Sequence, residues 1–405
     1  MNCPTRCATR GRSAEMRTLI IGGSLGGLAC AHEMRSTAAD VAVYERSVDR
    51  TQPRGAGIVM QREVADLLAQ IGRSVPSVSV LLAERQQLHR HDEPHRYTAP
   101  QWMTAWDTLY HALRDPLGDL CMRMDSTLTG LTRDGGEVTA TFADGYSSTG
   151  DIVVGADGIG STVRRLLTGR DDLRYSGYVA FRGLEPEADL PEEVVNLLAE
   201  RFTMFAVRGL QMLCYLVPGL TGETSPGQRR VNWVWYVNTD EVRMDQLMTG
   251  RSGQRFDQFL PPGELSDDSQ TALRDLADQQ LPQPFINLIK HSRVFLQPVY
   301  DLAPARMMAD HVALIGDAAG TVRPHTASGT SKALGDAAGL AAALADWEPG
   351  RPLAEDSIQA WERSRLSHLQ SVARSGIQLA RQSGLGPEGP QYLKIGAKTT
   401  RRQRG

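Results

Sequence analysis

The chain has 405 residues, long enough for two or three domains around a large core. Its 44 basic and 47 acidic residues nearly cancel to a formal net charge of −3, which argues against nucleic acid as the main partner. No apolar run approaches the ~20 residues that a membrane span needs, so we expect a soluble protein without a membrane partner.

The chain ends and the cysteines bear on location. Residues 1–15, MNCPTRCATRGRSAE, are polar, rich in arginine and without the apolar stretch of a secretory signal, so we expect a disordered tail. The basic end, KTTRRQRG, predicts a second tail. The five cysteines are scattered and contain no metal-type CxxC pair, which fits a reducing cytoplasm better than a disulfide scaffold.

The ordered chain opens with a strand, a glycine-rich turn, a helix and a second strand, in RTLIIGGSLGGLACAHEM and DVAVYER. Gly22 permits a tight turn and Gly27 permits close packing of the helix on the strand, while the helix N-terminus offers N–H groups to a pyrophosphate. Glu45, at the end of the second strand, stands where a carboxylate binds ribose hydroxyls. Ser24 replaces the middle glycine of GxGxxG, which weakens the fingerprint taken alone. The dinucleotide-binding residues predicted from this unit are Gly22, Ser24, Leu25, Gly26, Gly27, Glu45 and Arg46.

Two later segments repeat the pattern of a strand that runs into a glycine-rich turn. DIVVGADGIGSTVRRLL carries Asp157 between glycines, and HVALIGDAAG places Asp317 at the end of a strand. After Asp317 come Pro324 and His325, a run of small residues and a helix that begins near Gly329. Three such elements in one chain do not arise easily by chance.

In this order, the three elements resemble the signature of the aromatic-hydroxylase family of FAD-dependent monooxygenases, typified by p-hydroxybenzoate hydroxylase. The segments TAWDTLYHALR, GYVAFRG, NWVWY and RPHTASGTSKA are similar to its 2,6-dihydroxypyridine hydroxylase-like branch. The resemblance implies an α/β fold, in which a Rossmann-like FAD-binding domain carries an inserted, mainly β, substrate-binding domain and a C-terminal helical segment. The expected FAD-binding domain covers 16–75, 99–173 and 290–345, the substrate-binding domain covers 76–98 and 174–289, and the C-terminal helix and tail cover 346–405.

The same resemblance implies non-covalent FAD and assigns its contacts. Asp317 is expected to hydrogen-bond the ribityl chain, Asp157 to belong to the cofactor site, and Pro324 to pack beside the isoalloxazine. The small residues expected to let backbone N–H groups approach the flavin carbonyls are Ala327, Ser328, Gly329 and Thr330. The positions where the usual His, Asn, and Arg or Gln of the family are replaced are Gly320, Ser331 and Trp106.

Residues 174–290 alternate as strands do, in YVAFRG, FTMFAV, MLCYLV and VNWVWYV, and are expected to roof the substrate pocket. In VNWVWYV, Asn232 and Tyr236 share one face and Trp233 and Trp235 share the other, and the sequence does not say which face lines the pocket. The candidate substrate contacts are Tyr178, Tyr215, Asn232 and Tyr236.

The catalytic candidates are Pro324 and His325, with His325 as a possible base. A histidine of the loop HRHDEPH (His89, His91 or His95) is an alternative base. Because that loop is polar and contains proline, we expect no metal site in it.

The resemblance implies that NADH or NADPH reduces the flavin, that O2 then gives a flavin C4a-hydroperoxide, and that its distal oxygen is transferred to an electron-rich hydroxylated ring of the hydroxypyridine type. A homodimer is expected from family habit. Three alternatives stay open. A flavin-dependent halogenase shares the fold, although Tyr-Val follows WVW where a halogenase has Ile-Pro. An epoxidase or Baeyer–Villiger oxygenase uses the same scaffold, and a flavin-binding sensor or carrier would bind FAD without substrate-stimulated oxidation of NAD(P)H.

Overall fold

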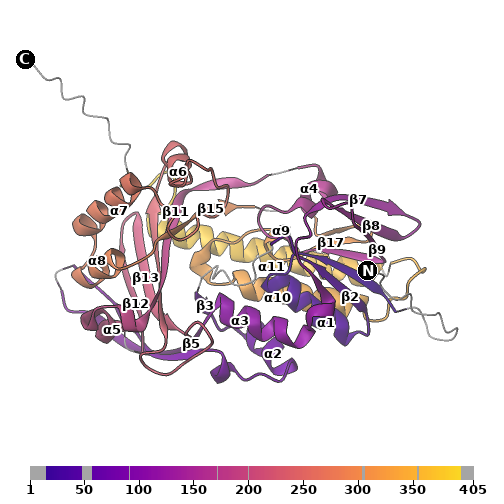
Figure 1. The fold of residues 1–405 in the computed structure, drawn as a ribbon, viewed down its shortest axis with the longest axis horizontal. Helices are drawn as coiled ribbons and strands as arrows, with labels where there is room; N and C mark the ends of the chain where they lie inside the picture. Colours follow the sequence, from indigo (N-terminus) through magenta and orange to yellow (C-terminus); the bar gives the residue numbers. More distant parts are fainter. Residues whose placement is uncertain are drawn as a thin grey trace, which may run out of the picture.

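The computed structural model describes residues 15–47, 57–90, 92–170, 172–198, 200–302, 306–353 and 355–393. A six-stranded sheet lies at one end of the molecule and an eight-stranded sheet at the other, and several helices, including the long C-terminal one, fill the middle (Figure 1). Within these ranges, no helix combines the length and the apolar character that crossing a bilayer requires.

The six-stranded sheet has the strand order β16-β17-β10-β1-β2-β6. Its strands are β1 (Arg17–Ile21), β2 (Asp40–Tyr44), β6 (Met122–Arg123), β10 (Ile152–Gly155), β16 (Met308–Ala309) and β17 (Val312–Leu314). β1 lies between β2 and β10 and is parallel to both, with Ile20 opposite Val43 and Val154. The central strands are buried on both faces, which accounts for their nearly continuous apolar sequences. Because β17 is also parallel to β10, the three glycine-rich turns leave the sheet at the same edge.

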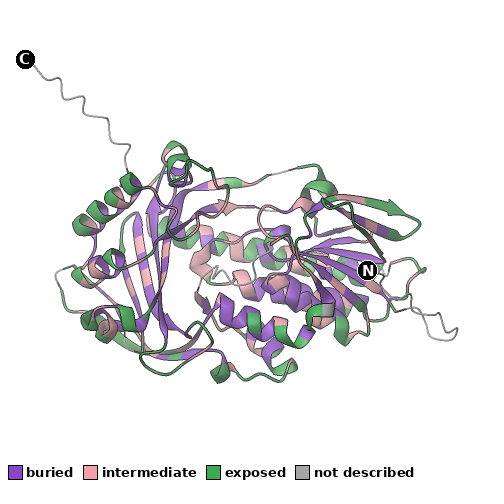
Figure 2. Cartoon of the chain, in the orientation of Figure 1, coloured by how far each residue is buried: buried purple, intermediate pink, exposed green. Residues whose placement is uncertain are grey.

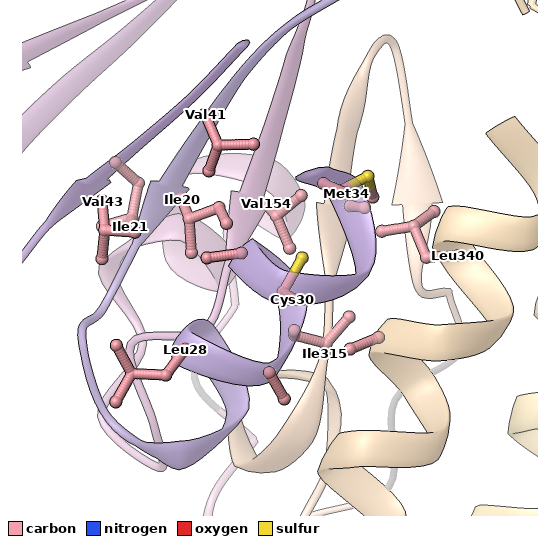
Figure 3. Packing of buried hydrophobic residues seen from close by; sticks show 14 of the residues in the cluster. Ile20, Ile21, Leu28, Cys30, Met34, Val41, Val43, Val154, Ile315 and Leu340 are labelled. Carbon is pink, nitrogen blue, oxygen red and sulfur yellow. The ribbon is translucent and has the colours of Figure 1, made fainter. Parts of the chain in front are cut away.

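Helices cover one face of this sheet and a small sheet covers the other (Figure 1). The helices are α1 (Leu25–Ser36), α2 (Arg62–Gln70), α3 (Trp106–Arg114), α10 (Gly329–Leu344) and α11 (Glu355–Gln382), and α10 contacts α1, α2 and α11. Met34 of α1 lies beside Leu340 of α10, and Ile20 and Val154 of the strands are buried in the same cluster (Figure 3). The small antiparallel sheet consists of β7 (Leu128–Asp134), β8 (Glu137–Phe142) and β9 (Ser147–Gly150).

Short elements follow the carboxyl ends of the strands. α4 (Thr162–Thr168) follows β10, and the one-turn helix α9 (Gly316–Ala319) follows β17. The 3₁₀ turns are η1 (Val75–Ser77), η2 (Asp115–Leu117), η3 (Asp119–Cys121), η4 (Glu187–Asp189) and η5 (Pro324–Thr326).

The eight-stranded sheet has the order β15-β11-β14-β13-β12-β4-β5-β3. Its strands are β3 (Gly57–Val59), β4 (Val80–Gln87), β5 (His95–Ala105), β11 (Arg174–Pro186), β12 (Arg201–Val207), β13 (Leu210–Val217), β14 (Arg230–Asn238) and β15 (Phe295–Asp301). The sheet is wider than the segments expected from sequence, since β3, β15 and much of β5 come from ranges that we assigned to the FAD-binding domain.

The two faces of this sheet have different partners. Trp233 and Trp235 point into a core shared with α5 (Glu192–Leu198), α7 (Asp267–Gln280) and α8 (Gln283–Lys290), which form an outer layer with α6 (Glu241–Leu247) nearby. That layer is exposed on its outer surface, while the strands beneath it are buried (Figure 2). Tyr236 instead shares a small cluster with Tyr178, Val299 and Ala380 of α11. The face that carries Asn232 and Tyr236 is therefore the one turned toward the middle of the molecule.

α11 joins the two ends. It packs on α10 along its first half, and just beyond its last residue the side chain of Asn238 binds the chain that follows. Asn238 Nδ2 donates to the carbonyls of Gly384 (2.9 Å) and Pro390 (3.0 Å), and its Oδ1 accepts from Gly386 N (2.8 Å). The C-terminal helix expected within residues 346–405 matches this element.

Candidate functional site

The first turn, between β1 and α1, is built so that side chains are excluded. Gly22 has φ of +109°, and a Cβ there would lie 2.4 Å from the carbonyl oxygen of Ala156. A Cβ at Gly27 would lie 1.8 Å from the carbonyl oxygen of Gly22, so α1 begins in direct contact with the turn. Ser24 is the N-cap of α1 and makes no side-chain capping bond, while Leu25 is buried and Gly26 faces Ala333 of α10. The first N–H groups of α1 are thus available to an anion at the sheet edge.

Glu45 reaches this turn from the end of β2. Its Oε2 accepts from Gly23 N (2.8 Å) and its Oε1 from Ser47 N (2.9 Å), so the carboxylate is held beside the glycines. Arg46 is exposed next to it. The ribose contact predicted for Glu45 requires this placement at the turn, and that contact stays a prediction.

Asp157, in the second turn, accepts its hydrogen bonds from neighbouring residues of the protein. Its Oδ1 accepts from Ser161 Oγ (2.5 Å) and its Oδ2 from the backbone N–H groups of Thr162 (2.7 Å) and Val163 (3.1 Å). Burial raises the pKa of its carboxyl, and these hydrogen bonds oppose the rise. Asp157 therefore caps α4 and fixes the turn, so any effect of this residue on FAD is expected to pass through the shape of the turn.

Asp317, in the third turn, differs from Asp157 in that its carboxylate is open to solvent and accepts no hydrogen bond within the described residues. Its side chain is exposed, yet burial raises the pKa of the carboxyl against the opposing charge of Lys332, which means that solvent reaches a group surrounded by protein. Within the described ranges, the Asp317 carboxylate accepts no hydrogen bond. A carboxylate held deep at a sheet edge and open to solvent is suited to accept hydrogen bonds from hydroxyl groups of a ligand, as the predicted ribityl contact requires.

A buried ionic network that the sequence analysis missed holds this turn from behind. Gly316 N donates to Asp336 Oδ2 (3.0 Å), and Lys332 Nζ donates to the Gly316 carbonyl (2.6 Å) and lies 3.4 Å from Asp336 Oδ2. Arg365 of α11 donates to Asp336 Oδ1 (2.7 Å). Lys332 and Asp336 are the charged residues of α10, in GTSKALGDAAGLAAAL, and charges on so apolar a helix are the signal that could have revealed the network.

The loop between this turn and α10 presents small residues. Gln61 Nε2 donates to the Ala327 carbonyl (3.2 Å), and Ser331 Oγ donates to Gln61 Oε1, so the loop is tied to the start of α2. Ala327 is exposed and has φ of +52°, while Ser328, Gly329 and Thr330 are partly exposed. A Cβ at Gly329 would meet no atom within 4 Å. The loop and the N-terminus of α10 thus face open space in which a flat ring can approach the backbone.

His325 stands where this loop meets the eight-stranded sheet. Its Nε2 lies 3.0 Å from Tyr178 Oη, and its ring centroid is 4.7 Å from that of Tyr236. Burial and, to a lesser extent, the nearby charge of Arg323 together lower the pKa of His325 to about 4. Arg323 itself is paired with Asp301 through two hydrogen bonds of 2.9 and 2.6 Å. The imidazole is therefore neutral near neutral pH, and its unprotonated ring nitrogen can accept a hydrogen bond.

The other predicted substrate contacts lie on the same sheet face. Tyr215 is opposite Asn232, and its ring stacks on Phe202 with centroids 5.0 Å apart. Asn232 Oδ1 accepts from Gly57 N (2.9 Å), and its buried Nδ2 has no partner. All four predicted residues thus line one surface, together with His325. Trp106, in contrast, stacks on Tyr110 at the start of α3.

The alternative histidines are differently placed. His89 and His95 are exposed at the connection between β4 and β5, and His91 lies outside the described residues. Among the residues that are described, no group of three His, Cys, Asp or Glu side chains is close enough to hold a metal ion.

These features together fit FAD. The side-chain-free first turn and the free N–H groups of α1 suit a pyrophosphate, the solvent-reached Asp317 suits ribityl hydroxyls, and the open loop at Gly329 suits the flavin ring. The residues that would hold the cofactor come from the three glycine-rich turns at one sheet edge.

Comparisons with known proteins agree with this assignment. A family model described as FAD binding domain-like matches residues 175–301. The chain is 31% identical to 2,6-dihydroxypyridine 3-monooxygenase of Paenarthrobacter nicotinovorans over 384 residues, which cover 93% of this chain and 94% of that protein. It is 26% identical to 6-hydroxynicotinate 3-monooxygenase of Pseudomonas fluorescens over 387 residues, 89% of this chain and 90% of that protein. The structure of 2,6-dihydroxypyridine-3-hydroxylase from Arthrobacter nicotinovorans matches with a TM-score of 0.86 at 29% identity and covers 96% of each chain.

The predictions of an α/β fold, of FAD as cofactor and of a monooxygenase are thereby confirmed. The protein belongs to the aromatic-hydroxylase family of FAD-dependent monooxygenases.

Proposed function

We propose that this monooxygenase hydroxylates a small hydroxylated N-heteroaromatic ring of the hydroxypyridine type, with NADH or NADPH and O2 as co-substrates. The observation that carries the proposal is the neutral His325 paired with Tyr178 at the junction of the small-residue loop and the sheet face. The relatives named for 2,6-dihydroxypyridine and 6-hydroxynicotinate support this substrate class.

Bound FAD supplies the redox chemistry, accepting a hydride from the nicotinamide and, once reduced, activating O2 for transfer of one oxygen atom to the ring. The protein has three tasks. It binds FAD through the turns at Gly22, Asp157 and Asp317. It holds the flavin ring against the loop that follows Pro324, and it excludes water from the space between the flavin and the substrate.

The base is His325. A ring whose hydroxyl is ionised is a stronger nucleophile at carbon, so removing this proton accelerates attack on an electrophilic oxygen. His325 accepts hydrogen bonds in its neutral state, and the Tyr178 hydroxyl beside Nε2 offers a route for the proton away from the ring. Tyr215, Asn232 and Tyr236 bound the ring from the sheet.

Two further statements belong to this proposal. We place the protein in the cytoplasm because its cysteines are scattered along the sequence. We expect a homodimer because members of the family usually form one. The three described cysteines, Cys30, Cys121 and Cys214, are free and buried.

A panel of hydroxypyridines and phenols tests the proposal. The FAD-loaded protein is given each ring with NADH or NADPH under ¹⁸O2, and product mass and NAD(P)H consumption are measured together. We expect at least one hydroxypyridine to gain a single ¹⁸O atom in proportion to NAD(P)H oxidised, and to accelerate that oxidation at least about tenfold, equivalent to about 1.4 kcal/mol of barrier. A chloride-dependent halogenated product would favour a halogenase, and FAD binding without oxidation of NAD(P)H by any ring would favour a sensor or carrier.

A further inference from the structure

Arg182 lies in the middle of β11 on the sheet face that carries Tyr178 and Tyr236. In the register of the sheet it is opposite Val234 of β14 and Phe295 of β15. Alternate residues of a strand point to one face, so Arg182 points toward the middle of the molecule with Tyr178, away from the outer layer of helices. It is partly buried.

Among the described residues, the guanidinium of Arg182 has no partner. Across the described part of the chain it makes no hydrogen bond or ion pair, and its Nε is buried without a partner. Other arginines with buried side chains are satisfied: Arg229 by Glu187, Arg230 by Asp107 and Arg323 by Asp301. Removing a cation from water without a counter-charge costs free energy of folding. At a functional site, such a cation therefore indicates a ligand that supplies the negative charge.

The groups around Arg182 are hydrogen-bonding but uncharged. Burial raises the pKa of Tyr215 and of Tyr236, and in both cases the charge of Arg182 opposes the rise, which places the guanidinium near both phenols. These tyrosines come from β13 and β14, the two strands next to β11 on one side. Among the described residues, no carboxylate forms an ion pair with Arg182.

Asn232 supplies a second unused donor on the same face. Gly57 N can only donate, so the amide is oriented with Oδ1 toward Gly57, and Nδ2 is left as a buried donor without a partner. Asn232 lies one row from Arg182 on the neighbouring strand, and side chains in such diagonal positions are about 7–8 Å apart at their Cα atoms. Two donors at this separation can both reach oxygen atoms on the edge of a single ring.

We propose that Arg182 is the specificity-determining cation of the substrate pocket: it binds the ionised oxygen of the ring, with Asn232 Nδ2 donating to a second oxygen. The inference rests on the proposed function for the identity of the ring. Arg182 gives the pocket its preference for an anionic ring oxygen, while His325 accepts the proton that the ring hydroxyl releases. Holding the anion in place keeps the ring in its more nucleophilic form.

Binding of 4-nitrophenol tests this subsite without turnover. The anion of this probe is yellow and its neutral form is not, so absorbance reports the protonation state of the bound probe. Oxidised, FAD-loaded full-length protein is titrated with the probe at a pH where the free probe is mostly neutral. The variants are Arg182→Gln, Arg182→Lys and the matched control Arg174→Gln, at the exposed start of the same strand.

We expect the wild type and the control to bind the yellow anion. Arg182→Gln should weaken its binding at least about tenfold, the loss typical of a charged hydrogen-bond partner, and shift the bound probe toward the colourless form. Arg182→Lys, which keeps the charge, should restore the anion. FAD content and melting temperature report folding, and Arg182→Met replaces the Gln variant if that one does not fold.

Unchanged anion binding in a folded Arg182→Gln or Arg182→Met protein would overturn the assignment, as would a Lys variant that binds only the neutral probe. Failure of the proposed function gives a different pattern. A wild type that binds the anion through Arg182 but hydroxylates no ring of the panel would refute the hydroxylase proposal and leave the anion subsite standing.

Discussion

Replacing Asp336 by alanine is expected to destabilise the protein more than any exposed substitution, because three groups depend on this one carboxylate. Asp336 and Lys332 are each 1% exposed, and Asp336 accepts from Gly316 N, Arg365 Nε and Lys332 Nζ. Removing it leaves the Lys332 ammonium buried without a counter-charge. Breaking a buried pair from one side costs about 3–5 kcal/mol, so Asp336→Ala should lower the free energy of unfolding by about that amount.

The assay is urea unfolding followed by circular dichroism, with FAD release measured in parallel. FAD should be released more readily, because Gly316 N and its carbonyl both lose support and the turn that carries Asp317 loosens. The control is Asp346→Ala, just past α10 and exposed, which should stay within about 0.5 kcal/mol of the wild type. The double variant Lys332→Met/Asp336→Leu removes both charges and should recover part of the loss. An Asp336→Ala protein within about 1 kcal/mol of the wild type, or a double variant less stable than the single one, would refute the reasoning.

Four further predictions follow from the site. Asp317→Ala should weaken FAD binding by about 1–3 kcal/mol, the range for loss of a buried hydrogen-bond partner, and unchanged affinity by fluorescence titration would contradict its ribityl role. Gly27→Val should abolish FAD retention, because any Cβ meets the Gly22 carbonyl, whereas Ser24→Gly should retain it; the flavin-to-protein absorbance ratio after gel filtration decides both. FAD is expected to be non-covalent, so acid precipitation should release the yellow colour into solution, and flavin in the pellet would count against this. The pKa of His325 is lowered from 6.5 to about 4 on folding, so the unfolded chain takes up its proton first as pH falls, and stability should be lost from about pH 6.5 down to about pH 4. His325→Gln should flatten that part of the pH profile of the urea midpoint, and an unchanged profile would show that the residue titrates normally.

The parts of the fold that were predictable depend on local constraints. Gly22 and Gly27 carry their signal in the sequence because the turn that they form admits no side chain, whatever packs around it. The long helix α11 is equally local, since its apolar spacing and its terminal glycines act over a few residues.

The parts that were not predictable depend on distant partners. Both faces of VNWVWYV carry aromatic side chains, and what buries Trp233 and Trp235 is a pair of helices that begins at Asp267, far along the chain. Two charges four residues apart on an apolar helix could have indicated that Lys332 and Asp336 form an ion pair, but their burial depends on α11 and Gly316, which the spacing does not reveal. The unpaired state of Arg182 likewise depends on four strands meeting side by side.

The two large hydrophobic cores are built from different residues. One lies between the six-stranded sheet, α1 and α10, and the other between the eight-stranded sheet, α7 and α8, with no buried residue in common. A substitution on the inward face of β11, β13 or β14 therefore leaves the packing beneath the glycine-rich turns untouched. Variants of this chain can therefore accept a different substrate ring through a few substitutions at positions such as Arg182 and Asn232, while the FAD-binding domain stays unchanged. Directed evolution toward new heterocyclic substrates should concentrate its libraries at these positions.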